Sequence, residues 1–448
     1  MIDPRTSRFD VAVIGGGVAG IACAAELAEA DQRVALIEQR PTLGGRVHSH
    51  RDSMTGDMID NGPHLMVGGY FATRSLLRRL GTSSLVRFQP RLEIAMCDED
   101  GETVFRHRRL PRELGLAAGL AGMRGISWRD VWRTRDLLRS ARDESREKLD
   151  AMSCEVWFDR LGIPESVRRL FLNPICLSAL NDVPARASAA LFANVLARTF
   201  SDRGTDGLGF ITVPQTDLFE GAIQNLVEQA GGEVMLGKRA KQVLFHGERA
   251  VWVQFADGRE ITAQHVVVAV PHRAVPDLFD EQHRGALDSG ILESLGSAPI
   301  VNIHLWLNRP VLERPLLGLI GRPTQFVLGL DHIWTEPSRH HRVIGIISGP
   351  TGHAEKSHAE LIDQMMEDLR ACLPEAWGAE VVRSLVVKER AATFLPCPGL
   401  LMRRPGTRSP WPNVWWAGDW TASGFPATIE GAALSGSEAA RAILSVTH

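Results

Sequence analysis

Three glycines near the start of the chain have the spacing of a phosphate-binding turn. Gly15, Gly17 and Gly20 form the pattern GxGxxG in "GGGVAG". The first glycine of such a turn permits a tight bend, the second lets the backbone approach a diphosphate, and the third lets a helix pack closely on a strand. The helix that follows offers free N–H groups and the positive end of its dipole. Further along, the Glu38 carboxylate can accept hydrogen bonds from an adenosine ribose.

A second glycine turn follows and carries a cation. Gly44, Gly45 and Arg46 lie in the stretch "QRPTLGGRVHS". An arginine beside the first phosphate site can neutralise a diphosphate through charge-assisted hydrogen bonds. The two turns together are typical of flavoproteins that bind FAD in the glutathione-reductase manner. The sequence shows no second GxGxxG pattern, so we do not expect a separate NAD(P) domain.

The stretch "DNGPHLMVGG", from Asp60 to Gly69, surrounds one histidine with small and apolar residues. Glycine is costly to order, so its glycines indicate that another group approaches the backbone closely. His64 could act as a general acid or hydrogen-bond a hydroxyl, but it could equally pack on a cofactor or bond to a backbone carbonyl. Tyr70 is the only tyrosine of the chain and the one candidate for a phenolic acid. We expect Asp60, at a strand end, to be a turn or cap residue.

These residues require a sheet to position them, and the apolar pattern predicts one. The run "FDVAVI" (9–14) indicates a buried parallel strand, and a helix-forming segment connects it to a second strand, "RVALIE" (33–38). Residues 231–271 alternate short strands with glycine-containing turns. Near the C-terminus a strand at 414–417 precedes a helix that starts at about Ile429. We therefore predict an α/β fold with a glutathione-reductase-type FAD-binding Rossmann domain and a discontinuous α+β substrate domain.

The length and the order of the motifs predict two domains built from alternating pieces. The chain has 448 residues, beyond the size at which one core usually stops growing. Residues 8–85, 215–285 and 395–448 are assigned to the FAD-binding domain. Residues 86–214, which are rich in helical spacing, and residues 286–394, which mix strands with a helix, are assigned to the substrate domain.

Composition excludes several classes of protein. Apolar residues make up 44% of the chain and the net charge is −3 with mixed signs, which is typical of a globular protein and not of a nucleic-acid binder. The six cysteines form no CxxC pair, so we expect reduced thiols in a cytoplasmic protein and neither a disulfide framework nor a metal site. The sequence contains no apolar run of roughly 18 residues, so any membrane contact should be peripheral.

Four stretches of the sequence resemble the flavin amine oxidase and carotenoid desaturase superfamily, and most closely its bacterial hydroxysqualene dehydroxylase branch. They are the GxGxxG turn with "GGRVHS", "DNGPHLMVGGY", "FLNPICLSALNDVPARASAALFANVL" (171–196) and "AGDWTASGFPATIEGAALSG". Together they cover nearly the whole chain. Pro63 departs from this branch, which typically has Gln there. Because proline fixes φ and lacks an N–H, a hydrogen bond from that side chain does not carry over.

The resemblance implies non-covalent FAD and a set of residues that contact it. The backbone of Val243 is expected beside the adenine. Gly418 and Asp419 are expected to face the diphosphate and the ribityl hydroxyls. The helix N-terminus at Ala427, Thr428 and Ile429 is expected at the O2 and N1 side of the flavin, where its dipole stabilises negative charge. The stretch Asn61, Gly62, Pro63 and His64 is expected to pass along the isoalloxazine ring.

The resemblance also implies a reaction of squalene and hopanoid biosynthesis. Reduced flavin would deliver a hydride to an allylic carbon of hydroxysqualene, and the hydroxyl would leave as water with the help of an acid. The same scaffold could instead desaturate a polyprene. An amine substrate fits less well, because Thr428 stands where amine oxidases carry an aromatic residue. An FAD-binding scaffold without catalysis is the alternative of another class.

A lipophilic isoprenoid substrate implies contact with a membrane surface. Residues 110–139 combine Leu, Ala, Met and Trp with several arginines, as an interfacial amphipathic segment does, and we expect Leu116 and Leu120 on its lipid side. A helix pair with a solvated basic face is the alternative. In "FLNPICLSALN", Leu172, Ile175 and Leu177 are predicted either to line a substrate tunnel or to be plain core. The electron donor and the oligomeric state stay open.

Overall fold

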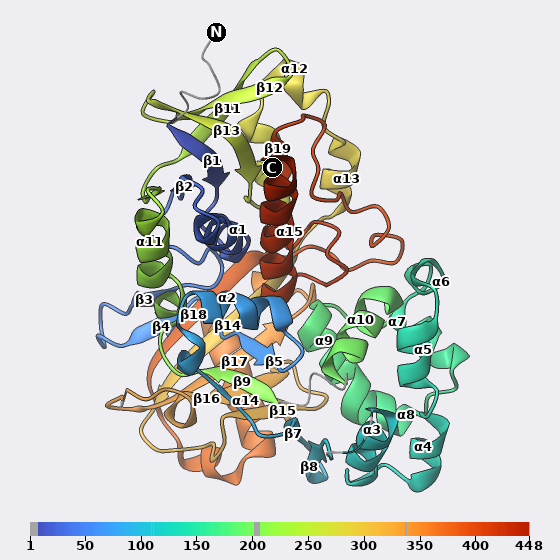
Figure 1. Ribbon diagram of the computed structural model, residues 1–448. Helices are drawn as coiled ribbons and strands as arrows, with labels where there is room; N and C mark the ends of the chain where they lie inside the picture. Colours follow the sequence, from blue (N-terminus) through green and yellow to red (C-terminus); the bar gives the residue numbers. More distant parts are fainter. Residues whose placement is uncertain (1–7, 109, 111, 201–206, 337, 448) are drawn as a thin grey trace.

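The computed structural model describes residues 8–108, 110, 112–200, 207–336 and 338–447. One sheet lies in the upper half of the view in Figure 1 and another in the lower half, with a group of helices beside the lower sheet. Each of these two sheets is assembled from segments that are far apart in the sequence. Residues from the two ends of the chain therefore meet in the upper sheet.

The upper sheet is parallel with an antiparallel extension. Its parallel strands, in spatial order, are β10 (Glu233–Met235), β2 (Val34–Ile37), β1 (Phe9–Ile14), β13 (Glu260–Val268) and β19 (Val414–Trp416). Strands β12 (Arg249–Phe255) and β11 (Ala240–His246) continue from β13 in antiparallel pairing. Apart from the half-exposed Asp10, β1 is buried, as its apolar sequence and its central place require.

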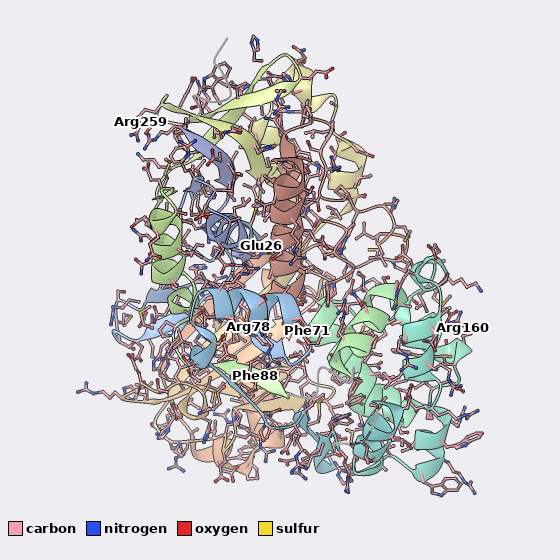
Figure 2. The ribbon with its side chains drawn as sticks, in the orientation of Figure 1. Glu26, Phe71, Arg78, Phe88, Arg160 and Arg259 are labelled. Carbon is pink, nitrogen blue, oxygen red and sulfur yellow. The ribbon has the colours of Figure 1, made fainter. Side chains whose placement is uncertain are left out.

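Helices cover this sheet and lock the two ends of the chain together. Helix α1 (Val18–Glu29) packs on α15 (Ile429–Thr447), and α11 (Glu220–Gln229) also packs on α1. The contact with α15 is close, because a Cβ at Gly436 would lie 2.1 Å from the carbonyl oxygen of Ala19. Glu26 of α1, labelled in Figure 2, accepts a hydrogen bond from Arg441 of α15 and faces Arg79 of α2 (Phe71–Arg79).

The lower sheet is antiparallel except where β15 pairs with β7 in parallel. Its order is β18 (Val381–Thr393), β14 (Ala298–Leu307), β17 (His341–Ser348), β16 (Phe326–Gly329), β15 (Leu316–Leu319), β7 (Glu93–Asp98) and β8 (Gly101–Arg106). Helix α14 (His358–Cys372) packs its apolar side, which includes Leu361 and Met365, on this sheet. A capping box between Ser357 and Glu360 begins that helix.

The helices beside the lower sheet come mostly from one stretch of sequence. They are α3 (Arg112–Ala121), α4 (Trp128–Arg133), α5 (Leu137–Asp143), α6 (Arg146–Asp150), α7 (Cys154–Arg160), α8 (Glu165–Val167), a π-helical turn (Arg168–Leu172), α9 (Asn173–Leu180) and α10 (Ala189–Thr199). Two further short helices, α12 (Glu281–Arg284) and α13 (Ser289–Ser294), follow β13 in the chain.

Two small sheets connect the larger parts. Strands β3 (Ser49–Arg51) and β4 (Met58–Asp60) form a hairpin, and β9 (Leu208–Ile211) pairs with both β5 (Leu65–Val67) and β6 (Val86–Phe88). The second of these sheets contains residues from both sides of the domain boundary expected at 85/86. The stretch after Asp60 is therefore held by strands that the sequence analysis assigned to the other domain.

Candidate functional site

The GxGxxG turn has the geometry that its glycines require. Gly15 has φ +112°, and a Cβ there would lie 2.6 Å from the carbonyl oxygen of Ala269. A Cβ at Gly20 would lie 1.9 Å from the carbonyl oxygen of Gly15. At Gly17 the nearest heavy atom would be the Cα of Gly45, 4.0 Å away. Two of the glycines are thus required by packing, and the middle one leaves room beside the backbone.

The second glycine turn lies directly against the first. Gly44 donates its N–H to the carbonyl oxygen of Gly16 at 2.8 Å, and Gly17 and Gly44 form a parallel bridge. Gly45 has φ +65°, and a Cβ there would lie 3.0 Å from the Cα of Gly17. The two turns therefore form one continuous backbone surface that a diphosphate can approach closely.

Glu38 lies at the end of β2 and is 8% exposed. Its carboxylate accepts hydrogen bonds from the backbone N–H groups of Gly16 and Arg40, each at 2.8 Å. These bonds fix the carboxylate beside the GxGxxG turn. An ionised carboxylate has about four lone-pair sites, so acceptor capacity is left for ribose hydroxyls.

Arg46 and Asp419 join the N-terminal and C-terminal motifs. The guanidinium of Arg46 donates to the Asp419 carboxylate at 2.6 Å and also to the carbonyl oxygen of Ala392. Asp419 is 7% exposed and follows Gly418, which has φ +152° and donates its N–H to the Ser435 hydroxyl at 2.9 Å. A cation and an anion are thus held at the side of the two glycine turns.

The stretch after Asp60 is held from both sides by side-chain amides. Asn302 of β14 donates to the carbonyl oxygen of Asn61 at 3.2 Å. Gln215 donates through its side chain to the carbonyl oxygen of Gly62 at 2.9 Å. Pro63 is half-buried. Neither Asn302 nor Gln215 was expected from the sequence, because each belongs to a segment without a recognisable motif.

Asp60 is the last residue of β4, and its side chain accepts hydrogen bonds from two other segments. It is 4% exposed, and its Oδ1 accepts a hydrogen bond from the Ser49 hydroxyl at 2.6 Å. The same atom accepts from the backbone N–H of Gln215 at 3.2 Å, at the start of a short 3-10 helix (Gln215–Leu218). Burial raises the pKa of Asp60 to about 6.

His64 lies close to Arg46. Burial and the positive charge of Arg46 lower the pKa of His64 to about 4, although the ring also faces the backbone carbonyl of Arg46, which acts in the opposite direction. The imidazole is therefore neutral at pH 7. A neutral imidazole offers one N–H donor and one acceptor, so it can bind a hydroxyl, but it is a poor proton donor.

Tyr70 and Glu430 bring the DNGPHLMVGG stretch to the first turn of α15. Burial and the nearby Glu430 carboxylate raise the pKa of Tyr70, so the phenol keeps its proton. Glu430 is 3% exposed and accepts hydrogen bonds from the backbone N–H groups of Ala72 and Thr73, each at 2.9 Å. The carboxylate from α15 thus caps the first turn of α2.

The N-terminus of α15 begins where the sequence predicted it, at Ile429. The Thr428 hydroxyl accepts a hydrogen bond from the backbone N–H of Gly431 at 3.1 Å, as an N-cap residue does. Ala427 and Thr428 are half-buried, and Ile429 is 6% exposed. The dipole of this long helix makes its first turn a site for negative charge.

Val243 is fully buried on β11, where it pairs with Val253. The backbone next to Glu38 belongs instead to Lys238, whose N–H donates to the carbonyl oxygen of Glu38 at 2.8 Å. Ala240 begins β11 two residues further along and is half-buried. Val243 therefore lies on the strand that starts close to Glu38, three residues after Ala240.

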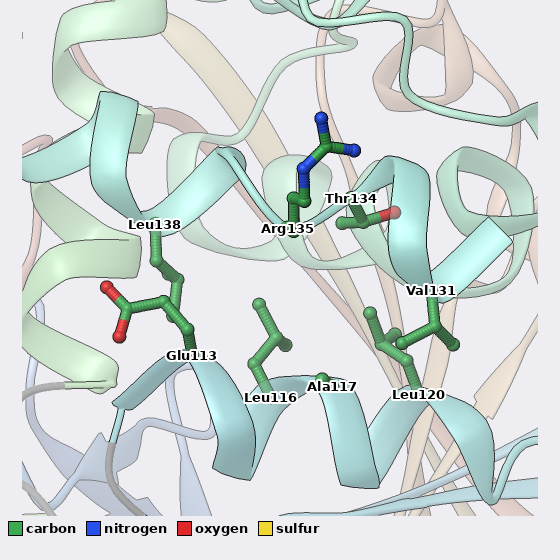
Figure 3. Close-up of a pocket in the computed structure, with 8 residues that line it drawn as sticks. All are labelled: Glu113, Leu116, Ala117, Leu120, Val131, Thr134, Arg135 and Leu138. Atoms are coloured by element: carbon green, nitrogen blue, oxygen red, sulfur yellow. The ribbon is translucent and has the colours of Figure 1, made fainter. Parts of the chain in front are cut away.

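The residues of the segment 110–139 divide differently from the sequence-based expectation. Leu116 and Leu120 are 4% and 1% exposed, so neither is on a lipid-facing side. They line a groove between α3 and the α4–α5 segment, facing Val131 and Leu138 (Figure 3). The exposed apolar residues of this region are Leu114, Trp128 and Trp132, together with Leu110.

The three residues named in "FLNPICLSALN" are not equivalent. Leu172 is fully buried and belongs to the core. Ile175 and Leu177 on α9 are half-buried. The C-terminal end of α9 is anchored by Asn181, which donates to the carbonyl oxygen of Pro299 at 3.2 Å and accepts from the N–H of Gly349 at 2.6 Å. Helix α9 is thus attached directly to the lower sheet.

Two glycine turns on a parallel sheet, a buried acid at the end of β2 and a joined Arg46–Asp419 pair define an FAD-dependent oxidoreductase of the Rossmann class. The chain belongs to the family of flavin containing amine oxidoreductases, whose model matches residues 18–444. FAD is accordingly its cofactor. The two turns, with space at Gly17 and cationic charge at Arg46, fit a bound diphosphate. In the described part of the chain, none of the helices is long and apolar enough to cross a membrane.

Individual relatives span nearly the whole chain. The hydroxysqualene dehydroxylase of Rhodopseudomonas palustris is 29% identical, over 97% of this chain and 98% of that protein. The 15-cis-phytoene desaturase of Solanum lycopersicum is 26% identical, over 98% of this chain and 79% of that protein. Among solved structures, cyclohexylamine oxidase from Brevibacterium oxydans superposes with a TM-score of 0.70 at 17% identity, over 98% of this chain and 99% of that one, which shows a shared fold.

Proposed function

We propose that this FAD-dependent oxidoreductase removes the hydroxyl of hydroxysqualene reductively and so forms squalene. The observation that carries the proposal is similarity over nearly full length to hydroxysqualene dehydroxylases, at 29% and 28% identity in two of them. A second observation supports a hydrocarbon substrate over an amine substrate. Amine oxidases carry an aromatic residue where this chain has Thr428, and the half-buried Ile175 and Leu177 are aliphatic. Bound FAD, once reduced, supplies the hydride.

The reaction balances when one hydride and one proton are added. The hydride replaces the hydroxyl at the allylic carbon, and the proton leaves with the hydroxyl as water. Hydroxide is a poor leaving group, so a hydrogen-bond donor at the hydroxyl lowers the barrier. The reductive direction also requires an electron donor for the flavin, which we propose as a partner of the enzyme.

We propose that His64 accepts a hydrogen bond from the hydroxyl, through the ring nitrogen that does not face the backbone carbonyl of Arg46. Its ring is neutral at pH 7 because burial and Arg46 lower its pKa to about 4, so it holds and orients the hydroxyl and does not act as an imidazolium acid. Tyr70 is the proposed hydrogen-bond donor to the leaving hydroxyl, because its phenol stays protonated.

The test is an anaerobic assay with dithionite-reduced enzyme, comparing hydroxysqualene with phytoene given to the oxidised enzyme. We expect squalene from the first and no desaturated product from the second. Desaturation of phytoene without squalene formation would overturn the proposal in favour of a polyprene desaturase. A flavin that transfers electrons to or from neither substrate would favour a non-catalytic scaffold.

His64→Ala and His64→Gln test the role of His64 within the same assay. We expect the Ala variant to lose roughly tenfold to a hundredfold in squalene formation, and the Gln variant to keep more activity because its amide oxygen retains an acceptor. The bound FAD of each variant is measured by absorbance, so that loss of cofactor is separated from loss of chemistry. Unchanged squalene formation by the Ala variant would restrict His64 to packing.

We also propose that the enzyme docks on an anionic membrane surface through α3 and α4. Leu114, Trp128 and Trp132 are 61%, 73% and 60% exposed, and Trp is enriched at membrane interfaces. Four exposed arginines lie in the same part of the chain, at positions 129, 133, 135 and 139. The Arg135 guanidinium stacks on the Trp132 ring, 3.7 Å from its centre. Exposed indoles beside cations match the headgroup region of an anionic bilayer.

Co-sedimentation with vesicles that contain phosphatidylglycerol tests this docking. We expect the double variant Trp128→Ser/Trp132→Ser to bind less than the wild type, because two apolar anchors are removed from the surface without disturbing the core. Trp377→Ser is the matched control, because Trp377 is 72% exposed on another part of the chain. Equal binding by the double variant and the control would refute docking through α4.

A further inference from the structure

His272 lies between the N-terminal and C-terminal parts of the cofactor site. It follows β13 after Ala269, Val270 and Pro271. Ala269 donates its N–H to the carbonyl oxygen of Ile14 at 2.8 Å, directly before the GxGxxG turn. The Trp420 indole donates to the carbonyl oxygen of Val270 at 3.0 Å, directly after Asp419. His272 is thus connected to both motifs by short backbone segments.

The ring of His272 is buried with one nitrogen unpaired. The residue is 7% exposed, and its Nε2 is buried and has no hydrogen-bond partner among the described residues. The other side of the ring faces the backbone carbonyl of Gly296. A buried polar atom without a partner costs free energy, so such atoms in native proteins usually have a ligand or water.

The charged groups that face His272 belong to the cofactor site. Asp419 and Arg46 both act on the ring, as does Arg273 next to it in the chain. The Arg46–Asp419 pair holds one positive and one negative group on this side. A ligand that reaches Arg46 at the two glycine turns therefore also comes near His272.

We propose that His272 binds the diphosphate of FAD through Nε2 and takes up a proton when the cofactor binds. The nitrogen that now lacks a partner becomes an N–H donor to a phosphate oxygen, while the other side of the ring keeps its contact with Gly296. The resulting imidazolium adds a second positive group to that of Arg46. No sequence motif marks this residue, because only the return of β13 to the sheet brings it to the site.

The direction of the pH dependence follows from the surrounding charges. Burial lowers the pKa of His272 in the protein without ligand. The negative charge of Asp419 raises this pKa, whereas the positive charges of Arg273 and Arg46 lower it further. A bound diphosphate favours the charged ring and raises that pKa. Affinity for FAD is therefore highest at pH values below the pKa of the free protein. It falls as the pH rises toward the pKa of the complex, and becomes constant above it.

Calorimetric titration of FAD into protein stripped of flavin tests the proposal. Titrations at pH 7 in two buffers with different ionisation enthalpies give the number of protons taken up per FAD. We expect the wild type to take up a fraction of a proton for each FAD bound. The variant His272→Gln should abolish this proton uptake and lower the affinity for FAD roughly tenfold to hundredfold. His265→Gln is the matched control, because His265 lies on β13 itself, where its ring pairs with the Trp415 indole at 3.3 Å.

Two readouts make the outcome decisive. Equal proton uptake by the wild type and His272→Gln would overturn the proposal, as would equal FAD affinity. A loss of affinity without any change in proton uptake would also overturn it, because the ring would then act as a neutral contact. Melting of each variant without FAD shows whether it is folded, and His272→Asn serves as a second variant if the Gln variant is not.

Discussion

Asp60 carries a charge that folding disfavours, and its replacement by asparagine should remove a pH dependence of stability. Its carboxylate is 4% exposed, and burial raises its pKa from 3.8 to about 6 despite hydrogen bonds from Ser49 and Gln215 and the positive charge of Arg342. Asn is close in shape, and its side-chain oxygen can still accept the two bonds that Oδ1 of Asp60 accepts. The variant Asp60→Asn therefore changes the charge and little else.

The magnitude follows from the difference in pKa between the folded and unfolded states. The folded value is the higher one, so the stability from this group is fully present below the unfolded pKa and is lost as the pH rises through about 6. About two pKa units correspond to about 3 kcal/mol. Relative to the wild type, Asp60→Asn should therefore gain about 2.5 kcal/mol in free energy of unfolding between pH 4 and pH 7.5, most of it below pH 6.5.

Urea unfolding at several pH values, with FAD in fixed excess, measures this difference. Asp52→Asn is the matched control, because Asp52 belongs to the same β3–β4 hairpin region. Burial raises the pKa of Asp52, but hydrogen bonds from Arg383 and Thr55 outweigh burial and lower it to about 2. Asp52→Asn should therefore destabilise by an amount that is constant from pH 5 to pH 8. A stability difference for Asp60→Asn that is equally constant would refute the reasoning.

Three further substitutions test other contacts. Glu430→Ala should lower the free energy of unfolding by about 2 to 4 kcal/mol, because it removes a buried cap from the first turn of α2; urea unfolding measures this. Gly20→Ala should prevent folding with FAD, because its Cβ would lie 1.9 Å from a carbonyl oxygen, whereas Gly221→Ala, with no atom within 4 Å, should give holoenzyme; bound flavin absorbance distinguishes them. Arg46→Met should weaken FAD binding about tenfold or more, as measured by calorimetry.

The cofactor turns were predictable from the sequence because their requirements are local. Gly15, Gly44 and Gly45 adopt positive φ angles, and such angles select glycine regardless of the rest of the fold. The strand before the first turn and the helix after it follow from apolar spacing. The start of α15 at Ile429 was predictable for the same reason, since "ATIEGA" contains its own N-cap residue, Thr428.

Exposure within the helical segment 110–139 was not predictable from spacing. Leu116 and Leu120 have the same apolar character as Leu114, yet the first two are buried and the third is 61% exposed. The difference arises because α3 packs on α5 and β8, which lie at other positions in the sequence. Amphipathic spacing indicates that a helix has an apolar side and a polar side. Which apolar residues become buried depends on the elements that pack against the helix.

The sequence by itself determined that this chain binds FAD on a Rossmann sheet, because short motifs specify the backbone shape that a diphosphate requires. Only the tertiary structure decided which distant side chains surround that shape. Arg46 meets Asp419 across the length of the chain, and Glu430 caps a helix that begins after Tyr70. The low pKa of His64 and the unpaired nitrogen of His272 likewise depend on burial and on neighbouring charges, which arise only when separate segments pack together.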